Sequence, residues 1–317
     1  MTGTGSKRIL VIKLGALGDF VQALNACAFI RRHHRSDGIV LLTTAPFADL
    51  ARASGLFDAI ELDARPKTHQ IFAGLANRRF LRAGRFARVY DLQTSDRSSF
   101  YFRLFWPGPY PEWSGIAPGC SHPHANPKRD FLHTLDRQAE QLCMAGIAAA
   151  EARFPDVSFL QADVSRLRVG SRYALLVPGG ASHRPDKRWP PERFAAIATE
   201  LSGGGVAPVL LGVAQEAPLT GRIRALVPAA VDLAGRTGLA DIAALARHAA
   251  GALGNDTGPM HLIAAAGCPS VVLFSAASDP ALCAPRGPRV TALRREPLAA
   301  LAVEEVLAAL RAVGGVS

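Results

Sequence analysis

Three stretches of this 317-residue sequence combine turn-forming residues with side chains that could do chemistry. The loop 15–19 (GALGD) ends in Asp19, the loop 182–191 (SHRPDKRWPP) contains Lys187, and the block 254–261 (GNDTGPMH) carries a carboxylate, a hydroxyl and a histidine. A carboxylate can remove a proton from a hydroxyl, and a lysine can neutralise a departing phosphate. The three stretches are therefore candidates for a group-transfer site.

The block 254–261 has the pattern of a helix N-terminus that follows a buried strand. An apolar run, 249–253, comes before it, Asp256 or Thr257 is placed to cap the helix, and Pro259 suits the first turn. The free N–H groups and partial positive charge of such a terminus attract phosphate. We expect the diphosphate of a nucleotide-sugar to bind here.

Each candidate residue also has a plain structural interpretation. Asp19 is either a general base or a helix-start carboxylate contributing about 1 kcal/mol. Lys187 either faces a leaving diphosphate or belongs to a solvated basic loop. His261, one helical turn after Thr257, either donates to a phosphate or sugar hydroxyl or is a core histidine. Glu216 either accepts hydrogen bonds from ribose or simply begins a helix.

The composition favours a globular protein, and several function classes are disfavoured. The formal charge of +10 suits phosphorylated small molecules or an anionic membrane, but no zinc finger, RRM signature or base-reading basic helix supports nucleic acid. No signal peptide or apolar run of membrane-spanning length is expected. The cysteines are scattered and odd in number, as in a reducing cytoplasm (Cys27, Cys120, Cys143, Cys268 and Cys283).

Neither a metal centre nor a dinucleotide site is expected. The pair His122 and His124 has no third ligand near it in the sequence. The loop 15–19 lacks the G-x-G-x-x-G order, and the second expected strand ends in residues 43–46 (TTAP) without an acidic residue for a ribose. We therefore expect no metal and no bound cofactor.

Apolar runs alternate with helical patterns along the whole chain, which predicts doubly wound α/β halves. The expected strands are 8–14, 39–43, 59–62, 88–92, 173–177, 208–212, 231–233, 249–253, 270–274 and 290–293, and the expected helices are 20–32, 47–54, 70–83, 133–150, 192–201, 216–227, 238–250 and 297–312. The aromatic, proline-rich segment 93–130 is expected to be a long irregular functional loop. We place one domain at 1–165 and another at 166–317, with a ligand cleft between them and the last helix a candidate to pack back on the first.

In order and spacing, these motifs resemble glycosyltransferase family 9, the lipopolysaccharide heptosyltransferases. The resemblance runs from Gly18-Asp19, through residues 186–190 (DKRWP) and 233–235 (LAG), to the block 254–261. It implies a GT-B architecture, two Rossmann-like domains whose parallel sheets face across a cleft. It also implies a metal-independent, inverting transfer of heptose from ADP-heptose to Kdo or heptose of the lipopolysaccharide inner core.

The resemblance also assigns roles to individual residues. Asp19 matches the general base and Lys187 the phosphate-binding lysine, with hydrolysis of the donor held off by closing of the domains. Asp256, Thr257, Gly258 and His261 match the donor-binding block, and Glu216 matches the ribose carboxylate. The loop after the strand 173–177 departs from the family pattern, and its Gly179, Gly180 and Ser182 are further expected donor-binding residues. The segment 93–130 has no match in the resemblance, and its charge alone suggests that basic residues there receive a lipid-linked or phosphorylated acceptor (Arg97, Arg103, Lys128 and Arg129). The protein is expected in the cytoplasm, peripheral on the anionic cytosolic face of the inner membrane.

Three alternatives stay open at this point. One is a GT-B transferase with another nucleotide-sugar or acceptor, and another is a sugar-nucleotide epimerase that needs no acceptor. The third is a nucleotide-sugar-binding module without catalysis, against which the presence of both Asp19 and Lys187 counts.

Overall fold

The computed structural model describes residues 6–63, 71–148, 150–151, 153–180, 184–314 and 316. Within it the chain divides into two compact units, Met1–Arg153 and Phe154–Ser317, each of which is described by itself. Ser182 and Gln70, the first residue of one expected helix, lie outside the described residues.

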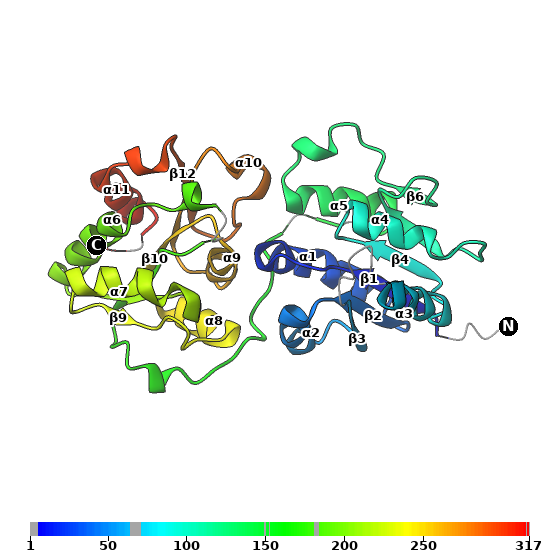
Figure 1. Ribbon diagram of the computed structural model, residues 1–317, viewed down its shortest axis with the longest axis horizontal. Coiled ribbons are helices and arrows are strands. Elements are labelled where there is room, and N and C mark those ends of the chain that lie inside the picture. The colour runs from blue at the N-terminus through cyan, green and yellow to red at the C-terminus, as the bar shows by residue number, and fades with distance from the viewer. Residues whose placement is uncertain are drawn as a thin grey trace. The chain divides into compact units, whose positions relative to one another are not determined.

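Unit 1 is a six-stranded parallel sheet with helices between its strands (Figure 1). Its main elements are β1 (Arg8–Ile12), α1 (Leu17–His33), β2 (Gly38–Thr43), α2 (Ala48–Ser54), β3 (Ala59–Leu62), α3 (Ile71–Ala83), β4 (Arg88–Asp91), α4 (Asp96–Arg103), β5 (Glu112–Gly115), β6 (His122–Pro123) and α5 (Thr134–Met144). The strand order is β3-β2-β1-β4-β5-β6.

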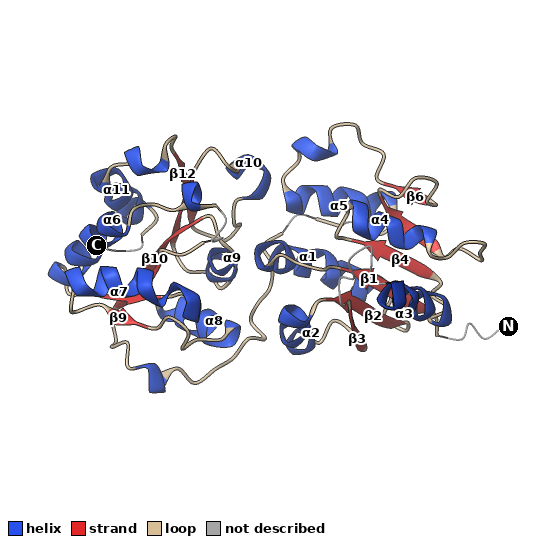
Figure 2. Ribbon diagram, in the orientation of Figure 1, coloured by secondary structure: helices blue, strands red, loops and turns tan. Residues whose placement is uncertain are grey.

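Unit 2 is also a six-stranded parallel sheet between helices (Figure 2). Its main elements are β7 (Tyr173–Val177), α6 (Pro191–Gly203), β8 (Ala207–Leu210), α7 (Ala217–Leu226), β9 (Val231–Asp232), α8 (Leu239–His248), β10 (Gly251–Asn255), α9 (Gly258–Ala265), β11 (Ser270–Phe274), α10 (Pro280–Cys283), β12 (Val290–Arg294) and α11 (Val303–Ala312). The short 3-10 turns η4 (Pro185–Lys187) and η5 (Ala214–Glu216) precede α6 and α7.

The two sheets share one topology, which confirms the predicted α/β class with two doubly wound parallel sheets. Counted within each unit, both strand orders read 3-2-1-4-5-6. In such a sheet the order reverses between the first and fourth strands, and ligands bind beyond the carboxyl ends of those strands. The switch points are therefore the ends of β1 and β4 in unit 1 and of β7 and β10 in unit 2.

The strands nearest the switch points are apolar because helices cover both faces of each sheet. All five residues of β7, β10 and β11 are buried, and so are four of the five in β1. The turn after β1 needs a glycine at position 15, whose φ is +120° and where a Cβ would lie 2.4 Å from the Phe47 ring.

The segment 93–130 is not the long irregular loop that we predicted. It contains α4, β5 and β6, and the last two extend the sheet beyond β4. Trp113 in β5 is fully buried and packs against Phe102 and Phe105. Short strands separated by proline-rich turns carry little periodicity, so the sequence pattern concealed them.

Other elements differ from prediction at their ends. Helix α1 begins at Leu17, so Asp19 lies inside its first turn, and the last helix of unit 1 ends at Met144. Trp189 anchors α6 as expected, since it is 1% exposed, stacks edge-on against Phe194 and donates from Nε1 to the Leu301 carbonyl oxygen at 3.1 Å. Helix α11 packs on the core of unit 2 through Val306 and Leu310.

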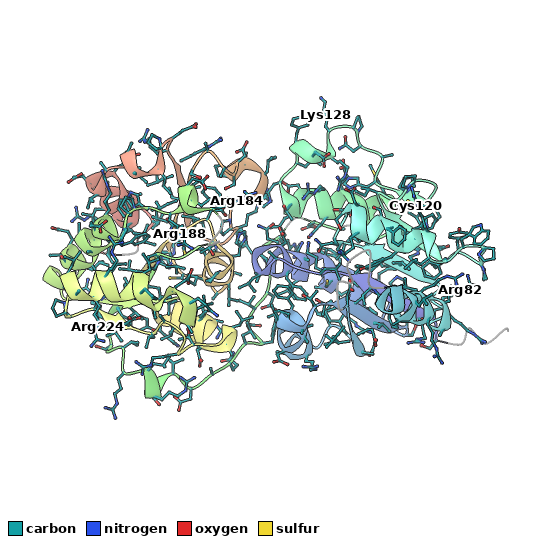
Figure 3. All side chains as sticks on the ribbon, viewed as in Figure 1. Arg82, Cys120, Lys128, Arg184, Arg188 and Arg224 are labelled. Atoms are coloured by element: carbon teal, nitrogen blue, oxygen red, sulfur yellow. The ribbon has the colours of Figure 1, made fainter. Side chains whose placement is uncertain are left out.

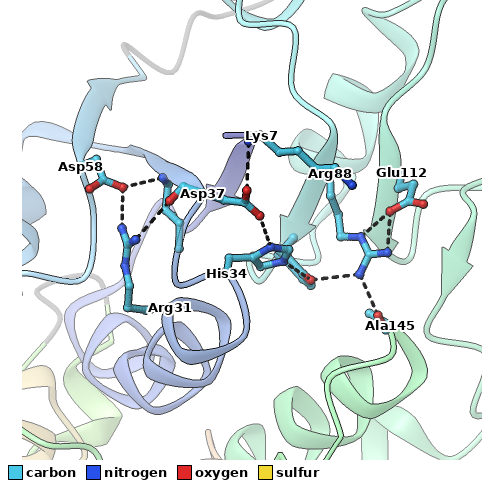
Figure 4. A network of polar contacts seen from close by, with 10 residues as sticks. Lys7, Arg31, His34, Asp37, Asp58, Arg88, Glu112 and Ala145 are labelled. Atoms are coloured by element: carbon cyan, nitrogen blue, oxygen red, sulfur yellow. Dashed lines mark hydrogen bonds and ion pairs between the residues drawn. The ribbon is translucent and has the colours of Figure 1, made fainter. Parts of the chain in front are cut away.

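A polar network pins the amino edge of the unit 1 sheet (Figure 4). His34 lies between the Asp37 carboxylate and the Tyr90 hydroxyl, each at 2.9 Å, and burial lowers the pKa of its imidazole. The Arg88 guanidinium reaches the Tyr90 hydroxyl and the Glu112 carboxylate. Arg88 is therefore neutralised inside the structure.

Within the described residues, no helix combines the length and the apolar character that crossing a membrane requires.

Candidate functional site

Asp19 lies at the switch point of unit 1, at the wall of a small polar cavity of about 70 Å³. The cavity is also lined by Lys13, Leu92, Gln93, Thr94, Thr134, Arg137, Gln138 and Gln141. Residues that follow β1 and β4 form one side of it and α5 forms the other. We observe no hydrogen bond from any described residue to the Asp19 carboxylate. Its oxygens are therefore available to accept a proton from a substrate.

A buried lysine and a partly buried arginine share the cavity with Asp19. Lys13 is 4% exposed, and its Nζ donates to the Leu92 carbonyl oxygen at 3.2 Å. Burial lowers the pKa of Lys13, against the attraction of Asp19 and Asp91, and burial also lowers the pKa of Arg137. Both cations attract the Asp19 carboxylate electrostatically. The nearby cations and the cavity distinguish Asp19 from an ordinary carboxylate at the start of a helix.

Asp91, at the end of β4, is completely buried behind the cavity. The backbone N–H groups of Gln93 and Thr94 donate to its Oδ1 at 3.1 and 3.0 Å. Its Oδ2 has no partner among the described residues, and burial raises the pKa of the carboxyl to about 6. Asp91 shapes the turn after β4, and it titrates near neutral pH.

At the switch point of unit 2, Lys187 and Asp256 form an ion pair. Lys187 Nζ lies 2.7 Å from Asp256 Oδ2, and the two side chains are 14% and 10% exposed. Ser278 Oγ donates to the same oxygen at 2.6 Å. Because this carboxylate is engaged with a lysine from 69 residues earlier, it does not cap α9.

The helix cap of α9 also differs from the prediction in detail. Thr257 is the N-cap residue, but its side chain accepts no cap hydrogen bond, and Gly258 and Pro259 begin the helix. His261 is 8% exposed within α9 and has an interaction partner. The helix N-terminus and the lysine are thus close in the fold, since Asp256 directly precedes Thr257 and contacts Lys187.

Asn255 is a residue whose role the sequence did not indicate. It is fully buried at the end of β10 and accepts from the Trp189 N–H at 3.1 Å. Its Nδ2 donates to the carbonyl oxygens of Pro178 and Gly179 at 2.8 and 3.1 Å. Asn255 therefore joins the loops after β7 and before α6 to the strand that leads into α9.

Glu216 fixes the loop after β7 by hydrogen bonds. Its Oε1 accepts from the Gly180 N–H at 2.9 Å and its Oε2 from the Val213 N–H at 3.0 Å. A Cβ on Gly179 would lie 2.0 Å from this carboxylate, so only glycine allows the approach. Each carboxylate oxygen keeps a second lone pair, which leaves a ribose contact open.

The four arginines and lysines assigned to an acceptor do not gather in one place. Arg97 and Arg103 lie at opposite ends of α4, and Lys128 projects from the outer loop of unit 1 (Figure 3). Arg129 is held by Asp130 at 2.6 Å and lies close enough to Arg137 to lower its pKa. Of the four, Arg129 is the residue that lies close to Arg137, which lines the cavity beside Asp19.

His124 serves the structure of this loop. Its Nε2 lies 2.7 Å from Glu140 Oε2, and Asn126 donates to the same carboxylate. Across the part of the chain that the structure describes, no three His, Cys, Asp or Glu side chains gather as metal ligands would.

Lys13, Arg137 and Asn255 had no assigned role before the structure. Lys13 interrupts an otherwise apolar run, 8–14, which is the one signal that could have marked it. Arg137 lies in a helix with many polar residues, and nothing in its spacing sets it apart.

Comparison with known sequences matches this chain to one family. The description of that family is glycosyltransferase family 9 (heptosyltransferase), and the match covers residues 122–307, more than half of the chain. It includes Lys187 and the block 254–261, whereas Asp19 lies before it. A curated relative, lipooligosaccharide heptosyltransferase 2 of Haemophilus influenzae, is 33% identical over 131 residues. That stretch is 40% of this chain and spans 38% of the relative's length.

Solved structures match over nearly the whole chain. The ADP-heptose LPS heptosyltransferase II of E. coli has a TM-score of 0.77 at 20% identity, over 96% of this chain and 98% of its own. The E. coli heptosyltransferase WaaC, solved with ADP, has a TM-score of 0.76 at 20% identity, over 96% and 99%. These likenesses show that the fold is that of the GT-B heptosyltransferases.

Proposed function

Because the chain belongs to glycosyltransferase family 9, the heptosyltransferase family, we propose that it transfers a heptose from ADP-heptose to a sugar hydroxyl. The proposed acceptor is a Kdo or heptose of the lipopolysaccharide inner core, carried on lipid. The Lys187–Asp256 pair at the start of α9 is the observation that carries the proposal, because a leaving diphosphate needs a cation at a helix N-terminus. The relatives named for ADP-heptose and solved with ADP support the choice of nucleotide.

In this reaction Asp19 removes the proton of the acceptor hydroxyl as its oxygen attacks the anomeric carbon from the face opposite ADP. The configuration at the anomeric carbon is therefore inverted in the product. Lys13 and Arg137 line the same cavity as Asp19 and attract its carboxylate electrostatically.

On the donor side, negative charge grows on the departing diphosphate. Lys187 and the N–H groups at the start of α9 stabilise that charge without a metal, and Asn255 and Glu216 keep the glycine loop 178–180 in position to receive the donor. Lys187 must exchange Asp256 for phosphate oxygens when the donor arrives.

The remaining expectations are part of the same proposal. The donor site includes Gly179, Gly180, Thr257, Gly258 and His261, and no cofactor beyond the donor is involved. The protein would act at the cytosolic face of an anionic membrane, where a lipid-linked acceptor is exposed.

The experiment is transfer from ADP-heptose to a purified Kdo-lipid acceptor in the presence of a metal chelator, followed by mass spectrometry. We expect a product heavier by one heptose and loss of turnover in Asp19→Asn. The proposal fails if no product forms, or if Asp19→Asn and the wild type give the same rate.

Two further measurements separate the alternatives. A thermal shift larger with UDP or GDP than with ADP contradicts the choice of nucleotide. Conversion of the donor without any acceptor indicates an epimerase, and donor binding without turnover indicates a binding module.

A further inference from the structure

One surface of unit 1 carries several arginines that no carboxylate of the described residues pairs with. Residues 71–90, which form α3 and the turn into β4, contain five arginines and neither Asp nor Glu. Arg88 is paired with Glu112. Arg79, Arg82 and Arg85 are exposed, and no carboxylate of the described residues pairs with them. This part of the surface is therefore strongly positive.

Large apolar side chains are exposed beside these arginines. Trp106 is 69% exposed and Tyr110 44% exposed, although Trp113 a few residues later is completely buried. On α3, Leu75 is 52% exposed and lies one turn before Arg79 on the same helix face. The segment thus fills the core of unit 1 and still leaves a tryptophan and a tyrosine outside.

Specific hydrogen bonds hold the two sets together as one surface. Arg82 Nη1 donates to the carbonyl oxygens of Phe105 and Trp106 at 2.7 and 3.0 Å, and its Nη2 donates to that of Gly108 at 3.1 Å. Arg78 Nη2 also donates to the Trp106 carbonyl oxygen, at 3.0 Å. The loop 105–108 is therefore fastened to α3, and Trp106 is presented by a fixed backbone.

A hollow of about 510 Å³ lies within the same surface. Its lining includes the rings of Phe86, Phe105 and Tyr110 together with Arg82 and Arg85. A hollow that is lined by both aromatic residues and arginines suits a molecule that is apolar at one end and anionic at the other. We call the whole area the arginine–tryptophan surface: Leu75, Arg78, Arg79, Arg82, Arg85, Trp106 and Tyr110.

We propose that the arginine–tryptophan surface docks the protein on an anionic lipid bilayer. Tryptophan and tyrosine concentrate at the boundary between headgroups and hydrocarbon, and arginines beside them attract acidic headgroups. The choice of a membrane over another polyanion rests on the proposed function, in which the acceptor is lipid-linked. The inference deepens that function by naming the face that meets the membrane.

This surface and the base Asp19 lie at different edges of the same sheet. The turn 84–87 and the loop 104–111 precede β4 and β5, so they lie at the amino edge, whereas Asp19 follows β1 at the carboxyl edge. Figure 3 marks the amino-edge position with Arg82. Docking through this surface therefore leaves the cavity beside Asp19 uncovered, and the two activities can be altered separately.

The test uses vesicles without donor or acceptor. The wild type should sediment with vesicles containing phosphatidylglycerol at about 0.15 M salt and stay in solution with pure phosphatidylcholine. Arg79→Glu changes the local charge by two units and should weaken partitioning about 25-fold, at about fivefold per charge. Trp106→Ala should weaken it about tenfold. The control Arg224→Glu makes the same charge change at an exposed residue of α7 in unit 2 and should alter partitioning less than about threefold.

The tryptophans supply an independent readout of the contact. Of the three in the chain, Trp113 and Trp189 are 0% and 1% exposed, so Trp106 alone can be quenched by brominated lipid. Vesicles of brominated phosphatidylglycerol should quench the wild-type fluorescence, and Trp106→Phe should abolish the quenching while most of the partitioning remains.

Several outcomes would overturn the docking proposal. The first is a wild type that does not partition to the vesicles, and the second is that Arg79→Glu and Arg224→Glu weaken partitioning equally. The third is that the wild type binds single-stranded DNA more tightly than vesicles and that this DNA binding depends on Arg79. Transfer to a delipidated soluble acceptor should be unchanged in Arg79→Glu and is measured alongside. A wild type that transfers heptose but does not bind the vesicles refutes the docking surface alone, and a wild type that binds the vesicles but transfers no heptose refutes the proposed function alone.

Discussion

The ends of β1 and β4 in unit 1 and the ends of β7 and β10 in unit 2 hold the same place in one strand order, yet their side chains differ. In unit 1 the position is a small cavity of about 70 Å³ that is lined by the Asp19 carboxylate, the buried Lys13 and the partly buried Arg137. In unit 2 it is a glycine loop, 178–180, with one ion pair at a helix N-terminus. The topology selects where a ligand binds, and the residues after each strand select the chemistry.

The difference suggests a division of work. A carboxylate beside cations, with no hydrogen bond occupying it among the described residues, suits proton removal. A lysine beside free helix N–H groups suits a developing phosphate charge. The predictions below test whether each switch point does one of these tasks, and they run from the largest expected effect to the smallest.

Asp19→Asn should lower kcat about 10³-fold, because proton removal by a placed carboxylate contributes about 10²–10⁴. Isothermal titration should give an unchanged Kd for ADP, since the proposed nucleotide site lies in unit 2. The control is Asp49→Asn, which removes another first-turn carboxylate, in α2. Equal loss of activity in the two variants would reduce Asp19 to a helix-start residue.

Lys187→Ala should lower kcat about 10²-fold, because one electrostatic partner of a developing anion typically contributes about 10²–10³. It also leaves the buried Asp256 carboxylate with Ser278 as its remaining side-chain partner. Arg184→Ala, three residues earlier and exposed, is the matched control and should change kcat less than about twofold. If the arginine variant is the more impaired, the assigned lysine is wrong.

Asn255→Ala should destabilise unit 2 by about 3 kcal/mol, because it removes three hydrogen bonds from a buried site. Denaturant unfolding followed through the buried Trp189 reports this change. Asn25→Ala in unit 1 removes one hydrogen bond, from Nδ2 to the Glu151 carbonyl oxygen at 2.7 Å, and should destabilise by about 1 kcal/mol. Similar losses in both variants would contradict the joining role of Asn255.

Asp91→Asn should stabilise unit 1 by about 1–3 kcal/mol above pH 7, because each unit of pKa shift corresponds to about 1.4 kcal/mol. In the folded protein this pKa is about 6, against 3.8 for a free carboxyl, so folding favours the protonated form. Wild-type stability should therefore fall as pH rises from about 4 to about 6 and then stay level.

The asparagine variant should lose that part of the pH dependence, since its amide cannot ionise. Unfolding curves of both proteins at a series of pH values provide the measurement. A wild-type protein that becomes more stable between pH 4 and 6, relative to Asp91→Asn, would contradict the raised pKa.

Much of this fold could be predicted because its central strands are covered on both faces. Runs such as 9–12 and 271–274 are apolar without interruption, and Gly15 marks the turn after the first of them. The segment 93–130 escaped prediction for the opposite reason. Its strands β5 and β6 are four and two residues long, and their stability comes from Trp113 packing on distant aromatic rings rather than from a local pattern.

The sequence predicted the parts of the site that a single loop forms, but it did not predict contacts between two loops. The helix start after β10 could be read from Pro259 and its neighbours. That Asp256 faces Lys187 instead of capping the helix depends on a contact across 69 residues, which no local pattern encodes. Lys13 was hidden in the same way, since its role follows from its neighbours Asp19 and Asp91 in space.

The Lys187–Asp256 ion pair also implies that, before the donor binds, the lysine of the proposed donor site is already neutralised by the Asp256 carboxylate. A monovalent anion such as chloride gains little there, because it must displace a carboxylate that is already hydrogen-bonded to Ser278. A diphosphate brings more charge and more acceptor oxygens, so it can compete. In the proposed function the pair would therefore open for a diphosphate rather than for a monovalent anion, and its opening would free the Asp256 carboxylate beside the bound nucleotide.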